Sequence, residues 1–272
     1  MNATEGITVV KLGGALLDDA AALAMIARTI AAFEGPVIVV HGGGAEVDRR
    51  LAAAGIVSEK IEGVRVTPSE AMAEVVAALA GVVNHALVAA LQSAGANAVG
   101  LTLTDGGACV CARKTMPAGL GRVGEVVGGE GALWLGLVRD GFVPVLSSIG
   151  AEADGALNVN ADEAAAWVAK AVAAASLVLL TDVEGVRGAD GSTIGVLDLA
   201  EIERLIADGV IVGGMAVKCR SAASAAAASG VPVRIASWRD AGALSDGSRG
   251  TVVHALHGVG GVGRRRPGMV VG

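Results

Sequence analysis

Short apolar runs alternate with helical segments along most of this chain. Several of the apolar runs are continuous stretches of Val, Ile and Leu, a pattern typical of strands buried on both faces. The six runs are Ile7–Leu12, Val37–His41, Val99–Leu103, Phe142–Ser147, Leu177–Thr181 and Val231–Ala236. The alanine-rich segments between them are Ala20–Phe33, Ser69–Ala94, Asp162–Ala175, Leu199–Ala207 and Val217–Ser229. This alternation predicts an α/β fold with a mainly parallel central sheet, whose ligands bind at the carboxyl ends of the strands.

Length and composition limit the classes of function. The 272 residues suffice for one large domain or two lobes that share a sheet, and a 53% hydrophobic content excludes a disordered chain. The formal net charge of −6 argues against a nucleic-acid partner, although a local basic pocket can still hold an anion. Cys109, Cys111 and Cys219 cannot all pair within one chain. We therefore expect a reduced, cytoplasmic protein, and no signal peptide opens the sequence.

One stretch could be mistaken for a membrane span. The 30 residues from Val75 to Thr104 contain no Asp, Glu, Lys or Arg. Its large apolar residues, however, fall on one helical stripe: Met72, Val75, Val76, Leu79, Val82, Val83, Leu87 and Leu91. This periodicity predicts an amphipathic helix and no membrane partner.

Glycines follow the first two predicted strands directly. Lys11-Leu12-Gly13-Gly14 ends the first strand, and His41-Gly42-Gly43-Gly44 ends the second. Successive glycines carry a large backbone entropy penalty but allow a backbone to approach a phosphate or carboxylate closely. Either element alone could be a tight turn, whereas both on consecutive parallel strands predict an anion site. Gly213-Gly214-Met215-Ala216-Val217-Lys218 repeats the pattern, although Lys218 by itself would be interpreted as a solvated surface residue.

Three other segments leave alternatives open. Asn158–Asp162 precedes an alanine-rich helix, so its side chains either cap that helix or, through Asp162, hold lysines in place. Thr181–Val186 follows the fifth strand and either binds a nucleotide or only turns the chain. Glu59–Val66 shows strand-like alternation around Glu62-Gly63, a weak hairpin signal.

Several familiar kinds of site are not predicted. The sequence contains no G-x-x-x-x-G-K-[ST] loop, and the four histidines lack metal-ligand spacing, so we expect no metal site made of protein ligands. Gly258, Gly260 and Gly263 have dinucleotide-loop spacing, but they lie in a Gly/Arg-rich tail with no strand before them and no helix after. Cys109 and Cys111 alternate along a predicted strand and have no basic partner assigned to activate either thiol, which argues against a cysteine nucleophile.

Together these segments resemble the amino acid kinase family. The matching stretches, in the family's order and spacing, are Lys11–Gly14, His41–Gly44, Gly63–Thr67, Asn158–Asp162, Thr181–Gly185 and Gly213–Lys218, with Pro144–Gly150 and Ile235–Arg239 in support. The resemblance implies a three-layer αβα sandwich in two lobes. Residues 1–176 would bind an acyl amino acid and dimerise, residues 177–257 would bind ATP, and residues 258–272 would form a flexible tail.

The resemblance also implies a reaction. The γ-phosphoryl group of MgATP would pass to the γ-carboxylate of N-acetyl-L-glutamate and give an acyl phosphate; Gly63–Thr67 and Asn158–Asp162 are the most specific signals for this substrate. A carboxylate is already ionised at neutral pH, so the reaction needs no general base. Magnesium would be held mainly by phosphates and water.

Site residues carry over by their positions in these motifs. Lys11 and Lys218 would neutralise the transferring phosphoryl group, and Asp162 would orient both lysines. Gly13, Gly14 and Gly44 would donate backbone N–H groups to phosphoryl oxygens, Gly43 and Gly44 would contact the acyl amino acid, and Arg65 and Asn158 would bind its α-carboxylate. The nucleotide pocket would be lined by Asp182, Val183, Glu184, Gly185, Val186, Arg187, Val210, Ile211 and Val212.

Assembly and substrate leave further alternatives. We expect a homodimer through the small side chains of the helix Ser69–Ala94. We also expect insensitivity to arginine, because the first strand begins near Ile7 and leaves no room for the extra N-terminal helix of arginine-inhibited hexameric members. A sister kinase acting on N-acetyl-aminoadipate or a carrier-linked amino acid is one alternative. A non-catalytic nucleotide-sensing module is another, and the joint presence of Lys11, Asp162 and Lys218 argues against it.

Overall fold

The structure is a computed structural model that describes residues 6–17, 19–61, 64–240, 242, 244 and 249–255. The predicted tail, residues 258–272, and the turn of the predicted hairpin, Glu62-Gly63, lie outside the described residues.

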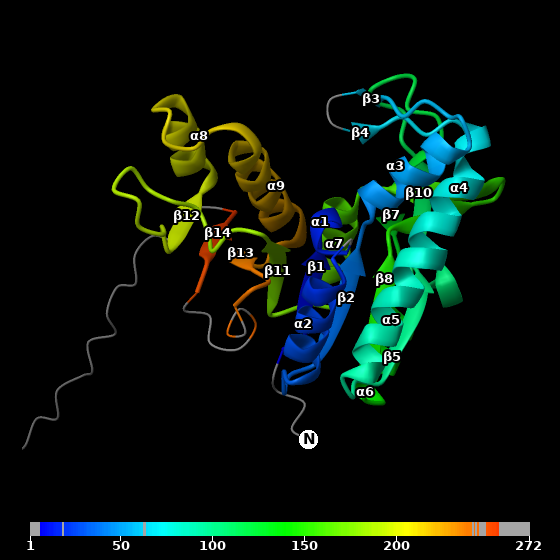
Figure 1. The fold of residues 1–272 in the computed structure, drawn as a ribbon, viewed down its shortest axis with the longest axis horizontal. Helices are drawn as coiled ribbons and strands as arrows, with labels where there is room; N and C mark the ends of the chain where they lie inside the picture. The colour runs from blue at the N-terminus through cyan, green and yellow to red at the C-terminus, as the bar shows by residue number, and fades with distance from the viewer. Residues whose placement is uncertain are drawn as a thin grey trace, which may run out of the picture.

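A central sheet of eight strands runs through the molecule (Figure 1) in the order β12-β14-β13-β11-β1-β2-β8-β5. Its strands are β1 (Thr8–Leu12), β2 (Val37–His41), β5 (Ala98–Thr102), β8 (Val143–Ser147), β11 (Ser176–Thr181), β12 (Val196–Asp198), β13 (Val233–Ser237) and β14 (Thr251–His254). Neighbouring strands are parallel except for the antiparallel pair β13 and β14. The prediction of a mainly parallel sheet is therefore confirmed.

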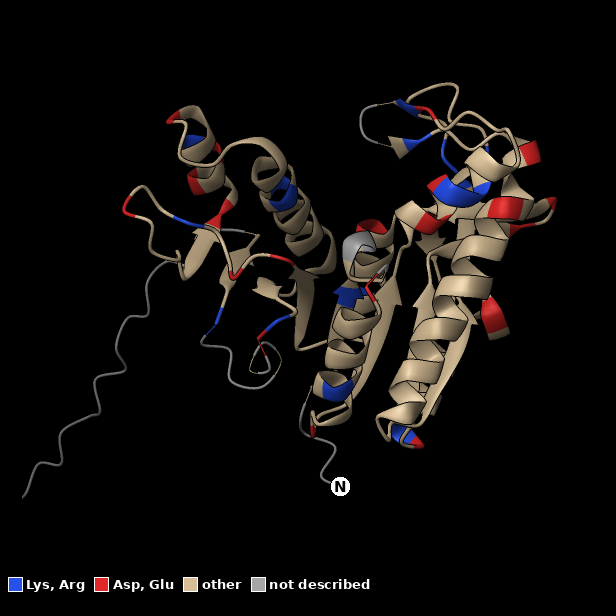
Figure 2. Ribbon diagram, viewed as in Figure 1, with Lys and Arg blue, Asp and Glu red and all other residues tan. Residues whose placement is uncertain are grey.

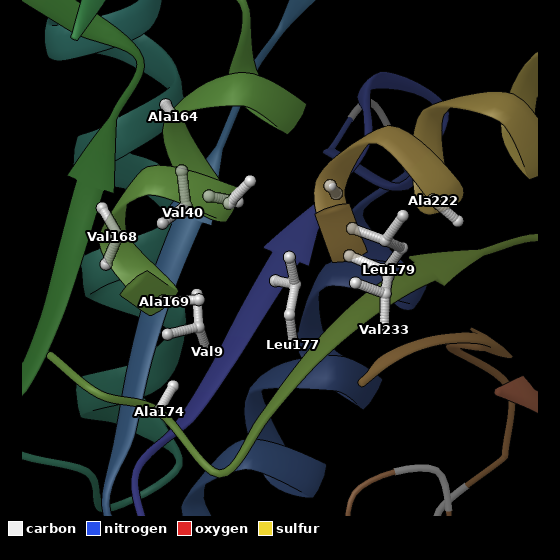
Figure 3. Packing of buried hydrophobic residues seen from close by; sticks show 14 of the residues in the cluster. Val9, Val40, Ala164, Val168, Ala169, Ala174, Leu177, Leu179, Ala222 and Val233 are labelled. Carbon is white, nitrogen blue, oxygen red and sulfur yellow. The ribbon is translucent and has the colours of Figure 1, made fainter. Parts of the chain in front are cut away.

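Helices cover both faces of this sheet. They are α1 (Gly14–Leu17), α2 (Ala20–Ala31), α3 (Gly44–Ala53), α6 (Ala132–Arg139), α7 (Ala161–Ala171), α8 (Leu199–Ala207) and α9 (Gly213–Ser229), together with the long helix described below and the short turn η3 (Asp105–Gly107). Successive strand residues point to opposite faces, so Val9 packs with α6, α7 and α9 while Val10 packs with α2 and α5. We call these two buried layers the α7-side core and the α2-side core; Figure 3 shows part of the first. The predicted αβα sandwich is thus confirmed.

The six predicted strands correspond to β1, β2, β5, β8, β11 and β13, with ends that differ by at most two residues. The predicted helix Asp162–Ala175 is shorter than expected, because α7 ends at Ala171 and Ala173 adopts a positive φ of 47°. Conversely, α9 begins at Gly213, one turn before the expected Val217.

A second sheet lies beside the carboxyl ends of β2 and β8. Its strands, in the order β6-β7-β10-β9, are β6 (Val110–Arg113), β7 (Val123–Gly128), β10 (Gly155–Val159) and β9 (Ile149–Glu152). The predicted hairpin is present as the short antiparallel pair β3 (Lys60–Ile61) and β4 (Val64–Arg65). The sequence does not predict this four-stranded sheet, because glycine and glutamate interrupt the apolar pattern of β7.

The long apolar segment is one continuous helix of 25 residues, Ser69–Ser93. It begins with a 3-10 turn, η1 (Ser69–Ala71), and α4 (Met72–Val76), passes through a π-helical stretch, η2 (Ala77–Val83), and ends as α5 (Asn84–Ser93). By length and composition alone it could cross a membrane. Its buried side chains, however, form a stripe against the protein core, which confirms the amphipathic helix except at Val82, a predicted stripe residue that is 48% exposed. Its acidic residues lie only near its N-terminal end (Figure 2).

The N-terminus of α2 offers a test of local stabilisation. The Asp19 carboxylate accepts hydrogen bonds from the backbone N–H groups of Ala21 at 2.8 Å and Ala22 at 3.2 Å. We expect Asp19→Ala to lower the free energy of unfolding by about 1 kcal/mol, because two amides lose their acceptor. Urea denaturation of Asp19→Ala and of Asp19→Ser, which restores an acceptor, measures the effect. Equal losses in both variants would contradict the capping role.

Candidate active site

Three cavities lie at the carboxyl ends of β1, β2 and β11, where ligands of a parallel sheet are expected to bind. The glycine-side cavity, about 210 Å³, is bounded by Gly42–Gly44, β4 and β10. The central cavity, about 200 Å³, lies between Lys11 and Lys218. The α9-side cavity, about 490 Å³, lies between the loop after β11 and the start of α9. Asp182 lines both the central and the α9-side cavity, so these two adjoin.

The central cavity brings two lysines to one place from distant parts of the chain. Lys11 comes from β1 and Lys218 from α9, and Gly13 and Asp162 line the same cavity. The ammonium group of Lys11 lies 2.8 Å from the Asp162 carboxylate. The other carboxylate oxygen of Asp162 accepts a hydrogen bond from the Ser221 hydroxyl at 2.9 Å. Asp162 therefore connects β1, α7 and α9 at this point.

The expectation that Asp162 orients both lysines is wrong for Lys218 in this structure. Lys218 donates to the carboxylate of Asp182, at 2.8 Å. The two oxygens of Asp162 are already engaged by Lys11 and Ser221, so each lysine has a carboxylate of its own. The hydrogen bond from Lys218 is the main reason that the pKa of Asp182 lies below its usual range.

The glycine-side cavity contains the residues expected to bind an acyl amino acid. Gly43, Gly44, Arg65 and Asn158 all line it. Gly43 precedes α3, and a Cβ atom there would lie 2.9 Å from the side chains of both Leu79 and Val83. No side chain in the described part of the chain caps α3, which leaves its first backbone N–H groups available to an anion.

Arg65 and Asn158 are held by neighbours. The Arg65 guanidinium contacts the Asp48 carboxylate and the Ser58 hydroxyl, and its Nη2 lies 3.4 Å from the carbonyl oxygen of Gly44. The contact with Arg65 lowers the pKa of Asp48. Asn158 donates from Nδ2 to the Thr67 hydroxyl at 3.0 Å. A guanidinium has five N–H donors, so these contacts leave Arg65 able to bind a carboxylate as well.

The α9-side cavity contains most of the residues expected around a nucleotide. Asp182, Val183, Glu184, Gly185, Arg187, Val210, Ile211 and Val212 line it. Val186 is the exception, because its side chain is fully buried in the α7-side core. Gly14, expected beside the phosphates, begins α1 at the carboxyl end of β1.

Several lining residues were not assigned to the site from the sequence. Met215, Ser237 and Arg239 line the α9-side cavity, and Ser221 and Trp238 line the central one. Arg239 stacks on the Trp238 ring at 4.0 Å and donates to the carbonyl of Asp182 at 3.0 Å. The carboxyl end of β13 was the available signal, because ligands of parallel sheets gather at such ends.

Comparisons with known proteins agree with this arrangement. The profile of the amino acid kinase family matches residues 6–237. The chain belongs to the amino acid kinase family. It is 44% identical to the acetylglutamate kinase of Aeromonas salmonicida over 85% of this chain and 90% of that protein. It is 43% identical to the acetylglutamate kinase of Moritella profunda over 85% and 88%, respectively.

A solved structure shares the fold of this chain. The crystal structure of smu.665 from Streptococcus mutans has a TM-score of 0.74 and 28% sequence identity, over 92% of this chain and 99% of that one. The resemblance deduced from the strand-end motifs is therefore confirmed.

The buried side chain of His41 supports the glycine-rich turn that follows β2. It is fully buried at the end of β2; Nδ1 lies 2.8 Å from the carbonyl oxygen of Gly42, and Nε2 lies 2.9 Å from Nδ2 of Asn84. Nδ1–H therefore donates to Gly42, and Nε2 accepts from Asn84. Burial lowers the pKa of His41 to about 4, so the ring is neutral near pH 7.

This neutral histidine predicts a pH-dependent stability. The unfolded chain protonates His41 below its ordinary pKa of 6.5, whereas the folded chain does so only near pH 4. The unfolded state therefore binds more protons between pH 6.5 and 4. The free energy of unfolding decreases as the pH is lowered through that range, by up to about 3 kcal/mol. Urea denaturation of wild type and His41→Asn should show a shallower decline in the variant. His85→Asn, a change at an exposed position, is the control; identical slopes in wild type and His41→Asn would contradict the assignment.

Proposed function

We propose that this protein transfers the γ-phosphoryl group of ATP to the γ-carboxylate of N-acetyl-L-glutamate. One observation carries the proposal: a cavity with a lysine on each side, Lys11 from β1 and Lys218 from α9, lies between a glycine-side and an α9-side cavity. While a phosphoryl group transfers between two anionic reactants, positive side chains on both sides of it stabilise its negative charge. The acetylglutamate kinases of Aeromonas and Moritella, which share more than two-fifths of their residues with this chain, support the choice of acceptor.

The glycine-side cavity would hold the acyl amino acid in the lobe formed by residues 1–176. Arg65 and Asn158 bind the α-carboxylate, and the amides of Gly43 and Gly44 at the start of α3 contact the bound molecule. The γ-carboxylate then faces Lys11. A carboxylate oxygen attacks the γ-phosphorus while the bond to the β,γ-bridging oxygen breaks, and ADP leaves with that electron pair. The attacking group is already ionised at neutral pH, so no side chain has to remove a proton.

The α9-side cavity would hold the nucleotide in the lobe formed by residues 177–257. Val183 and Val212 contribute apolar surface for the base. The first turn of α9 carries no side-chain cap from the described residues, so its backbone N–H groups can bind phosphate. Lys218, held by Asp182, reaches the central cavity from the same helix.

Magnesium would enter with the nucleotide. No three metal-binding side chains gather within the described ranges, and the two carboxylates beside the central cavity, Asp162 and Asp182, are paired with lysines. This donor set fits an ion held chiefly by phosphate oxygens and water. When bound, magnesium supplies further neutralisation of phosphate charge.

Trapping the acyl phosphate with hydroxylamine tests the reaction directly. Purified protein, MgATP and hydroxylamine are mixed in parallel with N-acetyl-L-glutamate, L-glutamate or N-acetyl-aminoadipate. Hydroxamate formed with N-acetyl-L-glutamate alone supports the proposal. Product only from another acid moves the substrate, and no product from folded protein refutes the catalytic function.

The two lysines give the sharpest mutational prediction. We expect Lys11→Ala and Lys218→Ala each to lower kcat by at least about a hundredfold, because each removes a charge that stabilises the transferring group. Lys170→Ala, an exposed lysine at the end of α7, is the matched control and should keep the wild-type rate. Full turnover by Lys218→Ala would contradict its assigned role.

We also propose that two copies associate through the outer face of the helix Ser69–Ser93, and that the enzyme acts in the cytoplasm. The middle of this face carries small residues such as Ala77, Gly81 and Ala86, with Val82 48% exposed, while Glu70 and Glu74 lie near its N-terminal end. The three cysteines, all described, are buried and free, as suits a reducing compartment.

Light scattering tests this association. Wild type should have the mass of a dimer, and Val82→Asp should shift it toward the monomer, because a carboxylate would have to be desolvated in the interface. Val196→Asp, the same substitution at an exposed valine on β12, is the control. A wild-type monomer or hexamer would overturn the assembly.

A further inference from the structure

We infer that Arg122 is a positioning residue for the acyl amino acid: it fixes the placement of Asn158 relative to the strand that carries Arg65. The inference rests on the proposed function, since it concerns how that function's acceptor is recognised. Arg122 lies just before β7 and its side chain is only 9% exposed. It acts through its neighbours rather than by touching the substrate.

The backbone of Arg122 joins the two segments that bear the binding residues. Its N–H donates to the carbonyl oxygen of Thr67 at 2.6 Å, and its carbonyl oxygen accepts from the N–H of Asn158 at 2.9 Å. Asn158 closes the ring with the bond from Nδ2 to the Thr67 hydroxyl, which itself donates to the carbonyl of Arg65 at 3.1 Å. Arg65, Thr67, Arg122 and Asn158 thus form one hydrogen-bonded unit.

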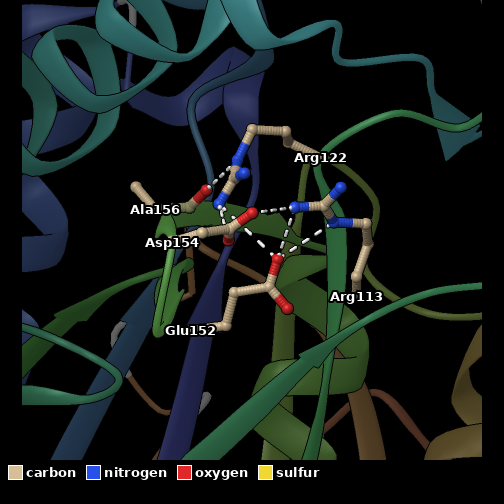
Figure 4. A network of polar contacts seen from close by, with 5 residues as sticks. All are labelled: Arg113, Arg122, Glu152, Asp154 and Ala156. Atoms are coloured by element: carbon tan, nitrogen blue, oxygen red, sulfur yellow. Dashed lines mark hydrogen bonds and ion pairs between the residues drawn. The ribbon is translucent and has the colours of Figure 1, made fainter.

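The guanidinium of Arg122 ties this unit to the turn between β9 and β10 (Figure 4). Nε donates to the carbonyl of Ala156 at 2.8 Å, and Nη2 donates to the Asp154 carboxylate at 3.0 Å. Nη2 also lies 3.6 Å from Glu152. The group passes so close to the turn that a Cβ atom on Gly155 would lie 3.4 Å from Nη2. Because β10 runs from this turn to Asn158, anchoring the turn fixes where Asn158 lies along the wall of the glycine-side cavity.

Arginine is required for this arrangement. One planar group satisfies a carbonyl and a carboxylate at the same time, which a lysine ammonium on a flexible stem does not reproduce. A buried guanidinium is also strongly held in place, because leaving its partners would strand its charge. The strand spacing is therefore fixed by a side chain that leaves the wall of the glycine-side cavity free for substrate.

Arg113 provides a matched comparison within the same network. It lies on β6 and binds the same two carboxylates, Glu152 at 2.7 Å and Asp154 at 2.8 Å. Its side chain is 41% exposed. Its backbone pairs with Gly124 on β7 rather than with Thr67 or Asn158. Arg113 thus contacts the same carboxylates as Arg122, but it does not lie between the segments that carry the binding residues.

The test compares two acceptors that differ only at the α-carbon. N-acetyl-L-glutamate carries the α-carboxylate, whereas 4-acetamidobutyrate lacks it but keeps the reacting carboxylate. For Arg122→Lys and Arg122→Ala we expect KM for N-acetyl-L-glutamate to rise by at least about tenfold, and the preference for it over 4-acetamidobutyrate in kcat/KM to fall by a similar factor. The KM for ATP should stay at its wild-type value. Arg113→Ala should change none of these quantities.

Each other outcome counts against the inference. Equal losses with both acceptors, or a matching rise in the KM for ATP, would mean that Arg122 only stabilises the fold. A wild-type preference in Arg122→Lys would mean that the guanidinium is not needed. If neither arginine variant folds, Asp154→Ala, a change on an exposed turn, should lower the acceptor preference more than Arg113→Ala does; equal preferences would refute the inference. Failure of wild type to phosphorylate N-acetyl-L-glutamate would instead refute the proposed function.

Discussion

The burial of β1, β2 and β11 on both faces is the constraint on which the site depends. Strands covered by helices above and below can offer groups to a ligand only where they end. Lys11, Gly42 and Asp182 all occupy such ends. Parallel pairing in register brings the three ends to one edge, so a single row of cavities forms there. The sheet thereby converts three short local motifs into one site without any need for long loops.

Around that edge, charge is distributed in pairs. Lys11 with Asp162 and Lys218 with Asp182 form two short ion pairs, and the Ser221 hydroxyl connects the first pair to the helix that carries the second lysine. Both pairs are partly solvated, and in each pair the carboxylate holds the ammonium group in one place. An acidic protein can in this way present two ammonium groups to anionic ligands, because its carboxylates hold the lysines in place.

The sequence predicts the parts of the structure that local pattern determines. Continuous apolar runs locate six central strands, and glycines after them locate the site. The second sheet escapes prediction because β7 mixes glycine and glutamate with valine. The helix α3 is not predicted because four of its five residues from Glu46 to Arg50 are charged, which leaves little apolar periodicity. Val186 is misassigned because its loop turns that side chain into the core. The partner of Lys218 depends on how α9 docks, which no single segment encodes.

The π-helical stretch Ala77–Val83 joins two halves of one helix that are buried in separate parts of the molecule. Val75 before it and Leu79 within it pack with Val47 and Leu51 of α3, whereas Leu87 and Leu91 after it pack in the α2-side core. A π turn holds one more residue than an α turn, and each residue rotates a helix by about 100°. Deleting a single residue there would restore an α turn and keep Leu87 and Leu91 against the sheet, whereas the same deletion within α4 would rotate the whole of α5 away from it. The π-helical stretch is therefore the part of the long helix where the residue count can change by one while the buried faces on either side stay in place.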